Sequence, residues 1–255
     1  GERKFVGLEN YIDVFTRDDC FNALKLSLYY MVGSMVQLAL ALLFATILSF
    51  NPKGGSFFRG ALYFPSLVCG IAVGFIFKYF YTHGFVLDSI LGLLGIPEDM
   101  LPFWLKDTRI NNWVLVASSI WRYMGQNMVL FIGAIASVDK TQYEAAAIDG
   151  ANAWHRFRYI ILPSIRTIVV LNMILAISGS LSVFEIPYVI TDGGFGTSTY
   201  FVLMDKLAHA NQKVGLASAM AVVLLVLILV VSGIQKLAEK KMNSGVRVGK
   251  RRARK

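Results

Sequence analysis

Five long stretches with few charges constrain this chain more than any other feature of its sequence. A helix needs about 20 apolar residues to cross the hydrocarbon core of a bilayer, and each stretch has that length. Hydrophobic residues make up 56% of the 255 residues and charged residues only 16%, which is more apolar than soluble domains are. We therefore expect an all-α, polytopic membrane protein with spans at about 26–50, 60–81, 113–137, 167–190 and 214–235.

Basic residues are distributed unevenly on the two sides of these expected spans. Segment 138–166 has four of them and the chain from residue 236 onward has nine, whereas the opposite side has seven in all. Because cytoplasmic loops are enriched in Lys and Arg, we expect 138–166 and the C-terminus to lie in the cytoplasm. Residues 1–23 would then lie outside. No signal peptide is visible there, so we expect a first span to be missing from this chain.

The net charge of +9 is concentrated in the C-terminal tail, 238–255. A basic end next to anionic headgroups is typical of membrane proteins, so the charge indicates lipid rather than nucleic acid as a partner. The two cysteines and three histidines show no disulfide framework and no metal-binding spacing. No phosphate-binding loop and no Ser, His and Asp arrangement stands out. We expect no catalytic residue, no metal and no cofactor on this chain.

Segment 144–163, EAAAIDGANAWHRFRYIILP, differs from the apolar stretches on either side of it. The alanines after Glu144 give a slim helical face that allows another backbone to approach closely. Gly150 permits a turn with positive φ into a second short helix, and Pro163 is expected to end that helix before the next span. These features favour a helix that inserts into a cleft of a partner protein.

The complete spacing resembles the EAA loop of permease subunits of binding-protein-dependent ABC importers, in the sugar branch that includes maltose-type and glycerol-phosphate-type permeases. The match comprises Glu144-Ala145-Ala146, three residues, Gly150, nine residues, Ile160, one residue and Leu162-Pro163. Further segments that resemble the family are FVGLENYIDVF at 5–15, FFRGALYFPSLV at 57–68 and ITDGGFGTSTY at 190–200. Two features differ from the family: Phe195 stands in place of a proline, and the first helix is absent.

The resemblance implies a type I ABC importer permease fold, with a permease domain at 24–237 and a cytoplasmic coupling loop at 138–165. The implied partners are a second homologous permease, two ATPase subunits that bind ATP and Mg²⁺, and an extracellular solute-binding protein. The implied location is a bacterial-type inner membrane, and the implied cargo is a sugar or oligosaccharide. The residues expected to contact the ATPase are Glu144, Ala145, Ala146, Asp149, Gly150, Leu162 and Pro163.

Arg122 and Glu185 are charged residues that fall inside the expected spans, where such groups usually face a cavity or a partner. Arg122 and Glu185 would lie roughly 14 Å and 8 Å from the outer ends of their helices, which is close enough for contact. Helical spacing also predicts a polar face around Arg122, and a second one with Ser178, Ser182 and Glu185. By resemblance to sugar permeases, the expected substrate-binding residues are Ser119, Arg122, Tyr123, Gln126, Asn127, Ser182 and Glu185.

Other interpretations of these polar residues remain open. An Arg122–Glu185 pair that only locks two helices, with packing serines, explains the same pattern. An ion-coupled secondary transporter would also have polar residues in its spans, although its acidic residues usually lie near the midplane. Weaker site candidates are Gln37, Asn172 and Lys78.

The chemistry of the cargo also remains open in the sequence. A glycerol phosphate would use the charge of Arg122, whereas a neutral oligosaccharide would use Tyr123 and Gln126.

Overall fold

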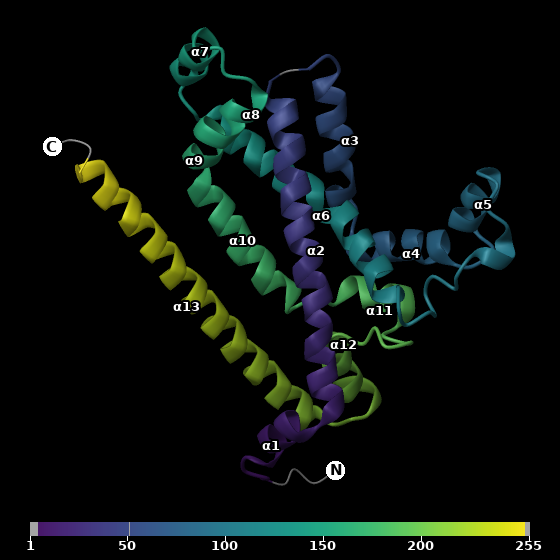
Figure 1. The fold of residues 1–255 in the computed structure, drawn as a ribbon. Helices are drawn as coiled ribbons and strands as arrows, with labels where there is room; N and C mark the ends of the chain where they lie inside the picture. Colours follow the sequence, from purple (N-terminus) through teal and green to yellow (C-terminus); the bar gives the residue numbers. More distant parts are fainter. Residues whose placement is uncertain (1–4, 51, 253–255) are drawn as a thin grey trace.

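The computed structural model describes residues 5–50 and 52–252, with side chains described as far as residue 240, and every regular element in these ranges is a helix (Figure 1). The all-α prediction is therefore confirmed. The elements are α1 (Glu9–Thr16), α2 (Asp18–Ser49), α3 (Gly55–Leu67), α4 (Gly70–Tyr81), α5 (Val86–Leu93), η1 (Glu98–Met100), α6 (Asn111–Ala136), α7 (Lys140–Ile148), α8 (Ala153–Arg156), η2 (Phe157–Ile161), α9 (Leu162–Ser164), α10 (Arg166–Ser180), α11 (Glu185–Thr191), α12 (Tyr200–Asp205), η3 (Lys206–Ala210) and α13 (Val214–Arg252).

Two described helices, α2 and α13, are long and apolar enough to cross a membrane, and the number rises to four if each of two bent helix pairs is one span. Helix α6 has 26 residues, but its middle contains the polar residues that the sequence singled out. Helix α2 begins at Asp18, so it extends into the segment expected outside at 1–23. Helix α13 continues through most of the predicted tail, whose residues 253–255 lie outside the described part, as do residues 1–4.

The stretches 60–81 and 167–190 are not single helices, so the prediction of an unbroken helix in each is wrong. Helices α3 and α4 meet at an angle of 100°. In the second stretch α10 ends at Ser180, and α11 begins only at Glu185. A further bend of 73° separates residues 153–164 from α10.

Local chemistry and tertiary contacts together account for these breaks. Pro65 lies in the last turn of α3 and has no N–H to donate to the helix. Pro187 lies in the first turn of α11, where a missing N–H leaves no intrahelical hydrogen bond unmade. Between α10 and α11, the Thr199 hydroxyl donates to the Val183 carbonyl at 2.7 Å. Pro65 thus favours the end of α3, and the hydrogen bond from Thr199 satisfies a carbonyl in the break between α10 and α11.

Helix α6 lies at the centre of the bundle and packs closely on its neighbours through glycines. A methyl group at Gly33 of α2 would lie 2.2 Å from Val116 Cγ1, and one at Gly125 of α6 would lie 1.9 Å from the Leu62 carbonyl oxygen of α3. Small residues allow membrane helices to approach in this way. The fully buried Phe131 continues the α2 and α6 interface towards α7.

At the other end of α6, polar side chains hold the glycine-rich loop that follows α11. Asn111 Nδ2 donates to the Phe195 carbonyl at 2.7 Å, and Asn112 Nδ2 donates to the Gly196 carbonyl at 3.3 Å. Phe195 has a φ of 52°. Because the ring of proline fixes φ near −65°, this conformation is incompatible with the proline found there in the resembling family.

The segment between α4 and α6 is organised around the buried carboxylate of Asp88. Gly84 N–H and Trp104 Nε1 both donate to it at 2.7 Å, and His83 Nδ1 lies 2.8 Å from Asp88 Oδ2. Burial raises the pKa of Asp88, but these hydrogen bonds and His83 outweigh that effect, so its pKa lies below the usual value. The segment between α4 and α6 is therefore built on a polar centre.

Candidate functional site

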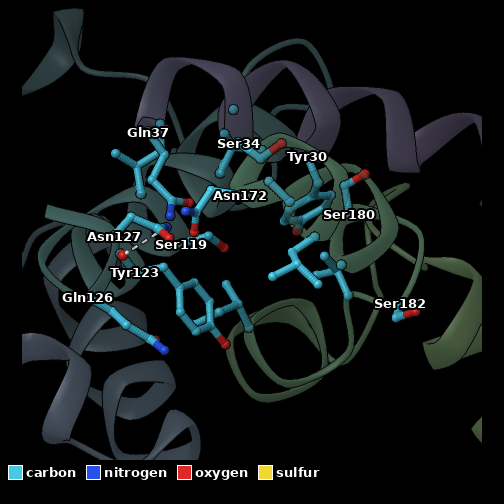
Figure 2. A pocket seen from close by; sticks show the side chains of 18 of the residues that line it. Tyr30, Ser34, Gln37, Ser119, Tyr123, Gln126, Asn127, Asn172, Ser180 and Ser182 are labelled. Atoms are coloured by element: carbon cyan, nitrogen blue, oxygen red, sulfur yellow. Dashed lines mark hydrogen bonds between the residues drawn. The ribbon is translucent and has the colours of Figure 1, made fainter. Parts of the chain in front are cut away.

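A cavity of about 640 Å³ lies among α2, α6, α10 and α11, near the middle of the bundle (Figure 2). Its volume is within the range of pockets that hold small ligands. Hydroxyl and amide groups from α2, α6 and α10 line it together with aliphatic side chains, and α11 adds the carboxylate of Glu185. The polar lining residues are Tyr30, Ser34, Gln37, Ser119, Tyr123, Gln126, Asn127, Asn172, Ser180, Ser182 and Glu185.

Helix α6 presents the polar face that its spacing predicts. Ser119, Tyr123, Gln126 and Asn127 all line the cavity, because residues three and four apart share a helix face. Asn127 Nδ2 donates to the Tyr123 carbonyl one turn earlier at 3.4 Å. The predicted neighbour Arg122 is absent from the described lining and points to the side of this face.

Helices α2 and α10 contribute wall residues that the sequence reasoning ranked low or missed. Gln37 and Asn172, the weaker candidates, are both in the wall and are buried, whereas Lys78 is exposed on α4 and is not among the described lining residues. Tyr30 and Ser34 were missed. With Gln37 they follow a spacing of four and three, which would have indicated one polar face of α2.

The second predicted polar face does not exist as a single helical face, because α10 ends at Ser180. Ser178 instead faces α13, where its hydroxyl lies 3.2 Å from that of Ser232. Ser182 in the break and Glu185 at the start of α11 still reach the cavity wall. The prediction that Ser178, Ser182 and Glu185 share one helical face is therefore wrong, although Ser182 and Glu185 do line the cavity.

Arg122 and Glu185 form an ion pair, which confirms the contact expected from their depths. The guanidinium of Arg122 also lies over the ring of Tyr123, 4.8 Å from its centroid. Both charged groups pack against Gly70, the first residue of α4. A methyl group there would lie 1.7 Å from Glu185 Oε2 and 2.3 Å from Arg122 Nη1. The pair thus joins α4, α6 and α11 at the edge of the cavity.

The segment 138–165 lies at one end of the bundle, far from α1 and α12 (Figure 1). The Asp139 side chain caps α7 by accepting from the Thr141 N–H at 3.0 Å, and Asn152 caps α8 by accepting from the His155 N–H at 2.9 Å. Gly150 has a φ of 74°, which confirms the predicted left-handed turn between the two short helices. Two capped helices therefore project from the bundle.

Most residues expected to contact an ATPase are accessible in this segment. Glu144, Ala145, Asp149, Gly150 and Pro163 are exposed, and Ala146 and Leu162 are half-buried. Pro163 lies within α9, which ends one residue later at Ser164, before α10 begins at Arg166.

Three large apolar or aromatic side chains outside the set expected to contact an ATPase are also exposed on this segment. Ile148 at the end of α7 is 87% exposed, and Trp154 and Tyr159 follow on the second helix. If this segment served only to connect two spans, large apolar side chains would have no reason to be exposed on it. An interface with another chain explains their exposure.

The chain is similar to membrane components of transport systems. Residues 37–244 match the family described as binding-protein-dependent transport system inner membrane component. The probable ABC transporter permease protein YesP of Bacillus subtilis is 30% identical over 232 residues, which cover 88% of this chain and 74% of that protein. The arabinooligosaccharides transport system permease protein AraP of Bacillus subtilis is 32% identical over 242 residues, which cover 91% of this chain and 75% of that protein. A bacterial ABC transporter involved in the import of the acidic polysaccharide alginate contains a chain of the same fold. The two chains superpose with a TM-score of 0.85 at 18% identity, and the match covers 94% of this chain and 85% of that chain.

Proposed function

The chain belongs to the family of binding-protein-dependent transport system inner membrane components, as its EAA segment predicts, and on that premise we propose that it is the sugar-translocating permease of an ATP-driven ABC importer. The observation that supports this most is the polar cavity in the middle of an otherwise apolar bundle. The cargo proposed is a sugar or oligosaccharide, in agreement with the named cargo of the relative AraP.

The side chains around the cavity suit a ligand with many hydroxyl groups. Amides such as those of Gln126 and Asn172 both donate and accept hydrogen bonds, and serine hydroxyls do the same. Tyr30 and Tyr123 add aromatic surface, which complements the apolar faces of a sugar ring. Polar groups are costly inside a membrane bundle, so their concentration around one cavity supports a cargo site.

The proposed energy source is a pair of ATPase subunits that bind ATP and Mg²⁺ and hold the projecting helices of 138–165. A second, homologous permease completes the translocation pathway, and an extracellular binding protein delivers the cargo at the end where α1 and α12 lie. Closure of the ATPase pair would move α7 and α8 and switch the cavity between inward-facing and outward-facing states. In this arrangement the C-terminus is cytoplasmic, and the chain itself catalyses no reaction.

Co-purification and uptake together test the proposal. The chain is expressed with its candidate partner permease, ATPase and binding protein, purified from membranes and reconstituted into vesicles. We expect a stable complex with two ATPase subunits and sugar uptake that requires ATP and the binding protein. Uptake driven by an ion gradient without ATP would instead support a secondary transporter and would contradict the proposal.

Gln126→Ala is expected to weaken sugar uptake while the complex stays assembled. Loss of one or two hydrogen bonds to a sugar hydroxyl costs on the order of 1–3 kcal/mol, so we expect the sugar concentration at half-maximal uptake to rise about tenfold. Initial uptake rates over a range of sugar concentrations measure this. Val129→Ala on the same helix is the control, because Val129 is exposed and lies outside the described cavity lining. Identical curves for Gln126→Ala and wild type would exclude Gln126 from the cargo site.

A further inference from the structure

We propose that Glu185 sets the charge selectivity of the cavity by neutralising Arg122, so that this chain's wall accepts uncharged saccharides and rejects acidic or phosphorylated ones. The inference rests on the proposed function and specifies the cargo class. It distinguishes the neutral oligosaccharide from the glycerol phosphate, the two cargoes that the sequence left open.

The lining of the cavity carries only one formal charge among its described residues, that of Glu185. The other polar lining groups are hydroxyls and amides, which bind uncharged hydroxyl groups well. A carboxylate or phosphate on the cargo would need a cation to replace the part of its hydration that it loses on entering this cavity. Because no lysine or arginine is among the described lining residues, the wall offers no free cation to an anionic cargo.

Arg122 is a cation adjacent to the cavity, but its charge is already neutralised by Glu185. Its Nη1 donates to Glu185 Oε2, its guanidinium stacks on Tyr123, and its side chain is only 12% exposed. The Glu185 side chain is 46% exposed and is itself part of the lining. An anionic cargo approaching Arg122 would therefore meet the Glu185 carboxylate first, and like charges placed together disfavour binding.

Gly70, the first residue of α4, lies directly against this pair. A methyl group there would lie 1.7 Å from Glu185 Oε2 and 2.3 Å from Arg122 Nη1, so the backbone of α4 closes the space behind both groups. A side chain at position 70 would therefore displace the pair. Glu185→Gln keeps the size of the side chain and removes its charge, so it leaves Arg122 uncompensated beside the cavity.

The test uses two trisaccharides, trigalacturonic acid and its trimethyl ester, which share one sugar backbone and differ at their carboxyl groups, charged in the acid and neutral in the ester. Their binding is measured by calorimetry on the purified complex of this chain, its partner permease and the ATPase, without binding protein. We expect the wild type to bind the neutral ester at least about tenfold more tightly than the acid, and Glu185→Gln to lower that preference about tenfold or more. In Arg122→Gln/Glu185→Gln, which has neither charge, the preference for the ester should return.

The outcomes separate this inference from the proposed function. Equal or tighter binding of the acid by the wild type overturns the inference alone, and this comparison requires no variant to fold. An unchanged preference in Glu185→Gln also overturns it, with Glu98→Gln in the exposed segment before α6 as the charge-matched control. If neither trisaccharide binds and the reconstituted complex transports no sugar with ATP, the proposed function fails as well.

Discussion

Ile148→Asp is expected to release the ATPase from the permease while the membrane bundle stays folded. Ile148 ends α7 and is 87% exposed, so in this chain alone it makes few contacts that the substitution could remove. In the proposed complex the same side chain is buried against the ATPase. A carboxylate placed in that interface without a partner would cost several kcal/mol, enough to lower ATPase affinity more than a hundredfold.

The measurement is the ratio of ATPase to permease after purification, together with ATP hydrolysis with and without sugar-loaded binding protein. Ile148→Leu is the matched control, because it keeps apolar volume at the same position and should retain both the ratio and the stimulation. If Ile148→Asp retains full stoichiometry and full stimulation, the coupling role proposed for α7 is wrong. The melting temperature of the chain should be the same for both variants, which separates docking from folding.

Gly125→Ala is expected to destabilise the bundle itself. The added methyl group would lie 1.9 Å from the Leu62 carbonyl oxygen, and the obstacle is the backbone of α3 rather than a flexible side chain. Overpacking of this kind costs typically 1–3 kcal/mol, and here α3 must also move away from α6. We expect a melting temperature in detergent lower by several degrees and a smaller yield of monodisperse protein.

Gly133→Ala on the same helix is the matched control. Nothing lies within 4 Å of a methyl group at Gly133, and replacing a helical glycine by alanine favours the helix by up to about 1 kcal/mol. Gly133→Ala should therefore melt at or slightly above the wild-type temperature. Equal melting temperatures for the two variants would show that the close contact of α3 with α6 does not limit stability.

Local patterns in the sequence account for much of this fold and for part of the site. The polar face of α6 follows from helical spacing alone, and the left-handed turn at Gly150 follows from the residue that best tolerates it. The contact of Arg122 with Glu185 could be predicted too, since two opposite charges at similar depths in a membrane bundle attract each other. The first two features depend on residues that are close in sequence, and the third depends on the attraction between one pair of opposite charges.

The break between α10 and α11 was harder to predict from the sequence, although Pro187 was a signal for it. An apolar stretch with few charges is interpreted as one helix, because mean hydropathy does not show where the chain changes direction. What stabilises the break is remote in sequence, since Thr199 bonds to the Val183 carbonyl and Arg122 pairs with Glu185. Hydropathy contains no information on such partners.

The sequence by itself determined the class of the fold, the family and the projecting EAA segment, because hydropathy and residue spacing are local properties. Only the tertiary structure decided which polar residues share a cavity and which do not. Gln37 of α2 and Asn172 of α10 face the same space as Gln126 of α6, while Arg122 is turned aside to Glu185. The physical reason is that a cavity wall is formed by helices far apart in the chain, whose rotation and bending are fixed by packing contacts such as those at Gly33 and Gly70.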